Sequence, residues 1–261
     1  MMHFWHMSGA GNDFMVMDAR GLTLDFSTLS KKLCAMTGAD GFMAVDYADD
    51  ADFLLHFYNA DGSRGEMCGN GSRCISLFAY ENGIAGEEMT IHTDAGLVHA
   101  RRLSENQYRV LLNDPGVLDL HRREDAAYVE LGTPGVPHGI VELPGLEFSQ
   151  MQDLLQRSVA LRHDPAFPKG ANISFYTWIG DATVRVLTYE RGVEDYTLAC
   201  GTGCASVAVT LAARGLLPTG KLTCENRGGT LKISLSQTDG CIHSIYLEGP
   251  ALCLRTYDLE L

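Results

Sequence analysis

The chain has 261 residues, enough for one large domain or two of ordinary size, and its 46% hydrophobic and 20% charged residues are typical of a globular protein. A formal net charge of −13 argues against a nucleic-acid partner, because phosphate contacts need lysines and arginines gathered on one face. No apolar run approaches the roughly 18 residues of a membrane span, and the first residues lack the layout of a signal peptide. We therefore expect a cytoplasmic protein, with no membrane or nucleic-acid partner, that acts on a small molecule.

In chain order, the first half is organised around the motif Cys68-Gly69-Asn70-Gly71. The strand before the motif ends in Asn59. The helical pattern after it runs to Gly83, where a left-handed cap would end a helix. The predicted elements of this half are a strand at 53–58, a helix from Gly69 to Gly83, and strands at 89–93 and 96–98.

The second half repeats this arrangement around Cys200-Gly201-Thr202-Gly203, and its helix meets Gly215 at the same offset. A weaker echo relates the segment 9–14 to the segment 170–175. Its predicted elements are a strand at 183–189 that ends in Glu190, a helix from Gly201 to Gly215, and strands at 222–224 and 229–233. Between the halves, the turn at 113–116 is the best linker. An outer helix follows at 149–162, opened by a capping box of Ser149 and Gln152.

This order predicts two α+β halves, each with several strands around a central helix that begins at its motif. We place the first domain at residues 1–115 and the second at 116–250.

The two motif cysteines are the candidate catalytic residues. A cysteine at a helix start lies among unpaired backbone N–H groups and a partial positive charge, which favours the thiolate and can lower its pKa from about 8.5 towards neutrality. The motif glycines would let a substrate carboxylate approach the same N–H groups. Inert burial is the alternative, and we disfavour it for Cys68 and Cys200.

The other six cysteines are expected to pack in the core as reduced thiols, because there is no export signal and no close pair of zinc ligands. They are Cys34, Cys74, Cys204, Cys224, Cys241 and Cys253. We expect no metal site and no organic cofactor, since the chain has neither a P-loop nor a dinucleotide fingerprint.

Two thiols on opposite faces of one α-carbon suit racemisation, if the halves close face to face. One thiolate would remove the α-proton while the other thiol returns a proton to the opposite face. The helix starts would stabilise the negative charge that grows on the substrate carboxylate.

Over essentially its whole length the chain resembles the diaminopimelate epimerase family. Two long blocks carry the resemblance, at 57–74 around Cys68 and at 190–203 around Cys200, together with Gly-Ala-Gly-Asn-Asp-Phe at 9–14. The resemblance implies a homodimeric, pyridoxal-phosphate-independent epimerase that interconverts LL- and meso-diaminopimelate on the route to lysine and peptidoglycan. It also implies two barrel-like sheets, each around a central helix, with the last strand, 251–261, returning to the first domain.

The resemblance assigns roles to the substrate-binding residues. The backbone of the motif residues after each cysteine would hold the reacting carboxylate, two residues would orient the reacting centre, and three would recognise the distal amino-acid end. In that order these residues are Gly69, Asn70, Gly201 and Thr202; Asn12 and Glu190; and Asn59, Asn172 and Arg191. From the residues alone, the asparagines could equally form turns, and the Glu190–Arg191 pair could be an ordinary solvated one.

The chain departs from the family at one position. Many members carry Asn before a Pro-His pair, where this chain has Val136 before Pro137 and His138. That asparagine helps to hold the distal end, so a racemase of another amino acid stays open. His138 matches the family and can tune the nearby thiol.

Three further interpretations stay open: another enzyme, namely an isomerase with a carboxylate base, and two proteins of a different class, a non-catalytic amino-acid-binding protein and a thiol redox sensor. Two intact cysteines in a repeated motif argue against the first two. The third would be a liability more than a function, because two facing thiols of low pKa can oxidise to a disulfide.

Overall fold

The computed structural model describes residues 1–65 and 68–260, and the chain divides into two compact units. The first unit comprises residues 1–111 and 248–261, and the second comprises residues 112–247. Of the sequence blocks discussed above, Glu66, Met67 and Leu261 lie outside the described residues. That the units are domains bounded at 115 and 250 stays a prediction.

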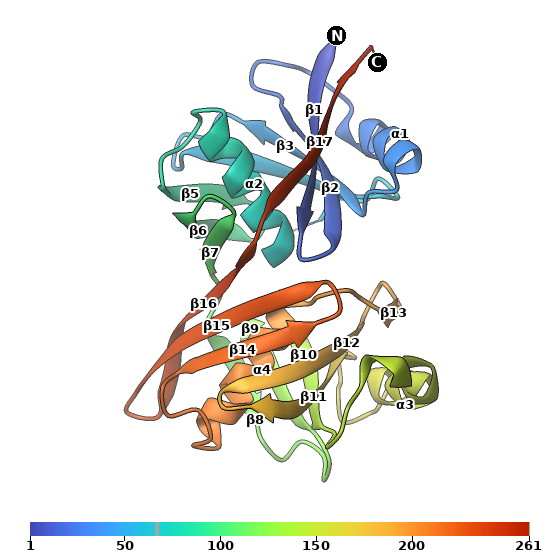
Figure 1. Ribbon diagram of the computed structural model, residues 1–261, viewed down its shortest axis with the longest axis vertical. Helices are drawn as coiled ribbons and strands as arrows, with labels where there is room; N and C mark the ends of the chain where they lie inside the picture. The colour runs from blue at the N-terminus through green and yellow to red at the C-terminus, as the bar shows by residue number, and fades with distance from the viewer. Residues whose placement is uncertain (66–67, 261) are drawn as a thin grey trace. The chain divides into compact units, whose positions relative to one another are not determined.

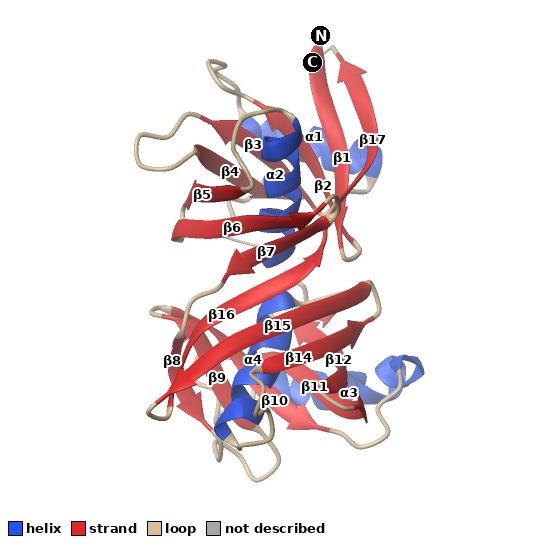
Figure 2. Ribbon diagram, turned by 60° about the vertical axis from the view of Figure 1, so that its left-hand side comes forward, coloured by secondary structure: helices blue, strands red, loops and turns tan. Residues whose placement is uncertain are grey.

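In the first unit, strands surround the central helix α2, which packs on β1, β2, β3, β6 and β7 (Figures 1 and 2). The elements are β1 (Met2–Gly9), β2 (Asn12–Asp18), α1 (Phe26–Thr37), β3 (Gly41–Asp46), β4 (Phe53–Asn59), α2 (Gly69–Glu81), β5 (Glu88–Thr93), β6 (Gly96–Ser104), β7 (Gln107–Leu111) and β17 (Leu252–Leu259). Neighbouring strands pair antiparallel, except for the parallel pairs β2–β3 and β4–β5. The last strand, β17, pairs with β1, so the chain end returns to this unit.

The second unit surrounds helix α4 in the same way, and α4 packs on β9, β10, β11, β12, β14 and β15. Its elements are β8 (Pro115–Asp119), β9 (Ala127–Gly132), β10 (Gly135–Glu142), the 3₁₀ turn η1 (Phe148–Gln150), α3 (Met151–Arg162), β11 (Asn172–Gly180), β12 (Thr183–Glu190), β13 (Asp195–Tyr196), α4 (Gly201–Ala213), β14 (Lys221–Asn226) and β15 (Gly229–Thr238). Strand β16 (Cys241–Pro250) leads out of this unit into the first.

The two units share one pairing pattern, which confirms the predicted pseudo-symmetric α+β fold. The parallel pairs β10–β11 and β12–β14 match β2–β3 and β4–β5, and β8 stands beside β9 as β17 stands beside β1. Strand β2 is therefore the counterpart of β10, and β3 is the counterpart of β11. The weak echo between 9–14 and 170–175 is wrong, because Asn172 begins β11 whereas Asn12 begins β2.

The two central helices have the same length and the same ends. Each spans 13 residues, and each is followed by a glycine with a positive φ, 65° at Gly83 and 73° at Gly215. The next backbone N–H then bonds a carbonyl five residues back, as in a Schellman cap. The predicted glycine stops are confirmed, and the local sequence accounts for them because only glycine adopts this conformation without strain.

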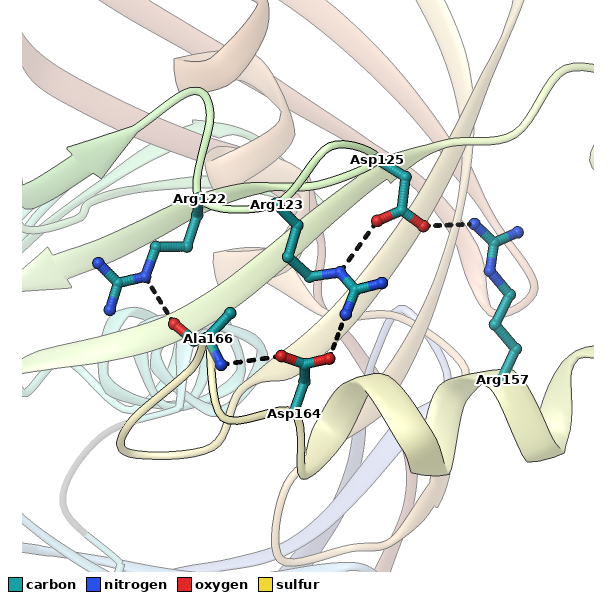
Figure 3. A network of polar contacts seen from close by, with 6 residues as sticks. All are labelled: Arg122, Arg123, Asp125, Arg157, Asp164 and Ala166. Carbon is teal, nitrogen blue, oxygen red and sulfur yellow. Dashed lines mark hydrogen bonds and ion pairs between the residues drawn. The ribbon is translucent and has the colours of Figure 1, made fainter.

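The outer helix of the second unit begins later than the predicted capping box. Helix α3 packs on β11, and the capping box forms two residues earlier than predicted, between Glu147, the N-cap of η1, and Gln150. Figure 3 shows how the end of α3 is held. Arg123 contacts both Asp125 and Asp164, and Arg157 of α3 donates to Asp125 over 3.1 Å. These ion pairs connect α3, and Asp164 just after its end, with the segment between β8 and β9. No helix in the described part of the chain is long and apolar enough to cross a membrane.

Candidate active site

Each motif cysteine is the N-cap of its central helix. The backbone of Cys68 is extended, its sulfur accepts the N–H of Gly71 over 3.4 Å, and α2 begins at the next residue. Cys200 caps α4 in the same way, and its sulfur accepts the N–H of Gly203 over 3.4 Å. The prediction that both thiols stand at helix starts is therefore confirmed. The thiol takes the place of the oxygen that usually fills this position.

In the first unit, the residue two positions after Cys68 joins the motif to strand β2. Asn70 is 4% exposed and its Nδ2 donates to Oδ1 of Asn12 over 2.5 Å. Nδ2 of Asn12 donates in turn to Asp40 over 3.3 Å, and Asp40 also accepts the N–H of Asp13 over 2.9 Å. The structure thus brings Asn12 and Asn70 together at the start of α2.

Asn59 lies at the end of β4, and its side chain works inside a turn. Its Nδ2 donates to Oγ of Ser63 over 2.9 Å, and its carbonyl accepts from Ser30 over 2.7 Å. The backbone of Ala60, the next residue, donates to the carbonyl of Asp40 over 3.1 Å. The turn-forming interpretation thus describes what Asn59 does in this structure, and its predicted contact with a substrate stays a prediction.

A buried arginine, which the sequence argument did not select, lies beneath the first motif. Arg73 has no exposed surface. Its guanidinium donates to the carbonyl of Gly69 over 3.1 Å, to Oδ1 of Asn70 over 2.9 Å and to the carbonyl of Pro250 over 3.2 Å. It therefore orients the amide that reaches Asn12 and ties the helix start to the returning chain end. In the sequence it is one residue of the helical pattern that follows Cys68, and its burial is visible only in the structure.

In the second unit, packing explains the last glycine of the motif. A Cβ on Gly203 would lie 2.8 Å from the hydroxyls of both Ser174 and Thr188, which bond each other over 3.0 Å. A Cβ on Gly201 would meet Leu247 at 2.5 Å. These glycines let α4 approach the surrounding strands. This packing requirement is separate from the expected role of the glycines, which was to let a substrate carboxylate approach the backbone N–H groups.

Burial decides the protonation state of Cys200. The residue is 7% exposed, and burial raises its thiol pKa well above 9.0, helped by the nearby negative charge of Glu190. The backbone N–H of Gly203 donates to the sulfur and acts in the opposite direction, and its effect is outweighed. The expectation that the helix start lowers this pKa is wrong for Cys200, because desolvation of a charged sulfur exceeds what one turn of backbone N–H groups returns.

His138 reaches the second motif from β10. It is fully buried, and burial lowers its pKa to about 3, with a further contribution from the positive charge of Arg191. Its Nε2 lies 3.0 Å from Oγ1 of Thr202 and 3.4 Å from Nδ2 of Asn172. The Thr202 hydroxyl also lies 3.5 Å from the Cys200 sulfur. The structure thus brings four predicted site residues into one connected group.

Glu190 ends β12, Arg191 follows it, and both border this group. The backbone N–H of Arg191 donates to Oδ1 of Asn172 over 2.7 Å, and its Nη1 donates to the carbonyl of Lys169 over 3.0 Å. Oε1 of Glu190 accepts from the Thr197 hydroxyl over 2.7 Å. The two side chains therefore have separate partners at the edge of the site.

The remaining cysteines divide into two groups. Four are buried, as expected, and two are exposed, which contradicts the expectation of core packing. The buried ones are Cys34, Cys74, Cys204 and Cys224, and the exposed ones are Cys241 and Cys253. Within the described residues, no group of three His, Cys, Asp or Glu side chains is placed to hold a metal ion.

The buried thiols make stability depend on alkaline pH. Burial raises the pKa of Cys74 to about 12 and raises that of Cys224 well above 9.0. An unfolded thiol ionises near pH 8.5, so the folded state is favoured below that pH and loses the advantage as pH rises towards the folded pKa. We expect the free energy of unfolding to fall by up to about 1.4 kcal/mol per pH unit for each of these two thiols.

Urea unfolding of the reduced protein at pH 8 and at pH 10 measures this fall directly. The same comparison with Cys74→Ala should show a smaller fall, since one titrating group is removed. An equal free energy of unfolding at the two pH values would contradict the assignment.

Solved structures define the fold class. A phenazine biosynthesis protein of the PhzF family from Bacillus anthracis matches with a TM-score of 0.74 at 14% identity, covering 100% of this chain and 99% of that one. A probable proline racemase from Agrobacterium radiobacter matches with a TM-score of 0.70 at 17% identity, covering 100% and 93%. At these identities the likeness establishes the two-unit fold alone.

Sequence relatives establish the family. The family model for diaminopimelate epimerase matches residues 4–116 and 132–253. The diaminopimelate epimerase of Aquifex aeolicus is 35% identical over 270 residues, covering 95% of this chain and 94% of that protein. The chain therefore belongs to the diaminopimelate epimerase family, as the two cysteine blocks predicted. It is an isomerase.

Proposed function

We propose that the protein converts LL-diaminopimelate to meso-diaminopimelate without an organic cofactor, by proton transfer between the substrate α-carbon and the thiols of Cys68 and Cys200. The observation that carries the proposal is the repeated N-cap cysteine. Both thiols occupy the same position in the two units, and the chain's relatives are named diaminopimelate epimerase. The proposal includes a role in lysine and peptidoglycan precursor biosynthesis, a cytoplasmic location and a homodimer.

The chemistry needs one thiolate and one thiol. The thiolate takes the α-proton and the opposite thiol delivers a proton to the other face, so the configuration inverts and the roles of the sulfurs exchange. The raised pKa of Cys200 makes it the thiol in the free protein. The backbone N–H groups at the two helix starts, at Gly69 and Asn70 and at Gly201 and Thr202, would hold the reacting carboxylate as it gains charge.

Recognition of the substrate is assigned to polar groups bordering the two helix starts. Asn12 and Glu190 would orient the reacting centre, and Asn59, Asn172 and Arg191 would bind the distal amino-acid end. The exposed guanidinium of Arg191 suits a distal carboxylate, which it would hold by a charge-assisted pair. Its backbone and one guanidinium nitrogen are already anchored, so the group is positioned before any ligand arrives.

The side chain at position 136 leaves a second substrate open. Val136 is 40% exposed and stands two residues before His138 on β10, so both side chains lie on the same face of the strand. A valine there offers no hydrogen bond to a distal polar group. A different amino acid with a less polar distal end is the alternative substrate.

The test is incubation of the reduced protein with LL-diaminopimelate in D₂O, followed by chiral separation and mass spectrometry. We expect meso-diaminopimelate that carries deuterium at the inverted α-carbon, because the delivered proton originates from a thiol that has exchanged with solvent. Absence of conversion would refute the substrate. A panel of other amino acids would then identify a related racemase by its α-deuteration.

A further inference from the structure

The second unit contains a hydrogen-bonded chain whose directions can be worked out atom by atom. It runs from the backbone of Arg191 through Asn172 and His138 to Thr202, and ends at the Cys200 sulfur. Its members come from the end of β12, the starts of β11 and α4, and from β10. These elements meet only in the folded unit.

The first link sets all the others. A backbone N–H can only donate, so the 2.7 Å contact from Arg191 fixes the carbonyl oxygen of the Asn172 amide on that side. The amide nitrogen of Asn172 therefore faces Nε2 of His138, at 3.4 Å. Because that nitrogen can only donate, Nε2 of the imidazole must accept.

His138 then orients the hydroxyl of Thr202. Its depressed pKa keeps the ring neutral, so an accepting Nε2 places the ring proton on Nδ1. Nδ1 has no partner among the described residues, and the choice of tautomer therefore rests on the Nε2 side. Asn172 and the Thr202 hydroxyl share this acceptor, and the hydroxyl at 3.0 Å makes the shorter contact, so its hydrogen points at Nε2. Its oxygen lone pairs are left for the Cys200 sulfur at 3.5 Å.

We infer that Thr202 is a positioning residue for the proposed epimerisation: its hydroxyl, oriented by His138 and Asn172, accepts the S–H of Cys200 and so holds Cys200 as the proton donor in the free protein. The hydroxyl cannot donate to a Cys200 thiolate without giving up its bond to His138. The direction of one hydrogen bond thus favours the thiol over the thiolate.

The first unit gives an independent comparison. Asn70 occupies the position of Thr202, and it donates to Asn12 on β2, the counterpart of β10. Two amides replace the hydroxyl and imidazole, and the Asn70 nitrogen cannot accept an S–H. The residue two positions after the cysteine, and its partner, therefore differ between the two units.

The charges around Cys200 act in the same direction. Glu190 raises the pKa of its thiol, and the second thiol of α4, Cys204, adds to the effect. Arg191 is the positive group that acts on His138, where it opposes protonation of the ring. The Gly203 N–H is the donor that remains available to a thiolate.

The test measures the pKa of Cys200 from the pH dependence of its alkylation by iodoacetamide. The intact reduced protein is used and the modified peptide is quantified by mass spectrometry. In His138→Phe the hydroxyl is free to donate to sulfur, so we expect the alkylation midpoint to fall by about one pH unit. In Thr202→Val the alkylation midpoint should not rise. In the double variant His138→Phe/Thr202→Val it should equal that of Thr202→Val, because His138 acts through the Thr202 hydroxyl.

Thr210→Val is the matched control, since within the described residues this hydroxyl on the same helix bonds only the carbonyl of Ser206 in the preceding turn. A raised midpoint in Thr202→Val would overturn the inference, because it would show that the hydroxyl donates to the sulfur. An unchanged alkylation midpoint in His138→Phe would also overturn it. So would a midpoint in His138→Phe/Thr202→Val that lies below that of Thr202→Val, because the effect of His138 would then not need the Thr202 hydroxyl.

A measurement on the unmodified protein covers the case in which a variant does not fold. Nitrogen NMR of ¹⁵N-histidine protein should show an unprotonated Nε2 and a protonated Nδ1 for His138, and the opposite tautomer would overturn the inference. The catalytic consequence rests on the proposed function, but neither measurement uses a substrate. Failure of the hydrogen-bond assignment and failure of the epimerase assignment are therefore distinguishable.

Discussion

Replacing either Cys68 or Cys200 by serine is expected to lower the rate of epimerisation on the order of 10³-fold, with little change in fold. A serine hydroxyl is far less acidic than a thiol, so it can neither carry the negative charge of the base nor exchange that role between turnovers. Serine is nevertheless a good N-cap, and it can accept the Gly71 or Gly203 N–H as the sulfur does. The measurement is the initial rate of LL- to meso-conversion, with circular dichroism as the check on folding.

The chain provides matched controls for these two variants. Cys253 in the first unit and Cys241 in the second are exposed free thiols, and their serine variants should keep the parent rate. The double variant Cys68→Ser/Cys200→Ser should be about as slow as either single variant, because residues that act as one unit are not additive. A single variant that kept the parent rate would exclude that thiol from the reaction.

Replacing Arg73 by methionine is expected to lower the free energy of unfolding by about 3 kcal/mol or more. Methionine keeps much of the apolar stem but leaves three acceptors without this donor: the carbonyls of Gly69 and Pro250 and the side-chain oxygen of Asn70. The Asn70 oxygen is buried, and a buried acceptor that loses its partner costs about 1–3 kcal/mol, to which the two partly buried carbonyls add. This loss is a large share of the roughly 5–15 kcal/mol that stabilises an ordinary domain.

Urea unfolding compared with the parent protein measures the loss. Arg101→Met is the control, because Arg101 is mostly exposed and pairs with an exposed Glu88 at 3.5 Å, and such surface pairs contribute about 1 kcal/mol or less. Arg73→Lys should be intermediate, since an ammonium keeps the charge and loses the planar fork. Equal stability of Arg73→Met and Arg101→Met would contradict the role assigned to Arg73.

Local chemistry made much of the fold predictable. A cysteine followed by glycine, a polar residue and glycine predicts a helix start, and a glycine 15 residues after each cysteine predicts its end. Both are properties of a few neighbouring residues. The repeat of this pattern predicted the two α+β units, and the family resemblance added the return of the last strand.

The sequence by itself determined the two N-cap thiols, the central helices and the family, because these depend on local backbone preferences and on long matching blocks. Only the tertiary structure decided what surrounds the thiols. Arg73 bonds Pro250 across 177 positions, and His138 meets Thr202 across 64. Burial and hydrogen-bond partners arise from such distant contacts, and no local pattern encodes them. For the same reason the structure reversed the expected pKa shift of Cys200, because desolvation depends on the whole unit that encloses the sulfur.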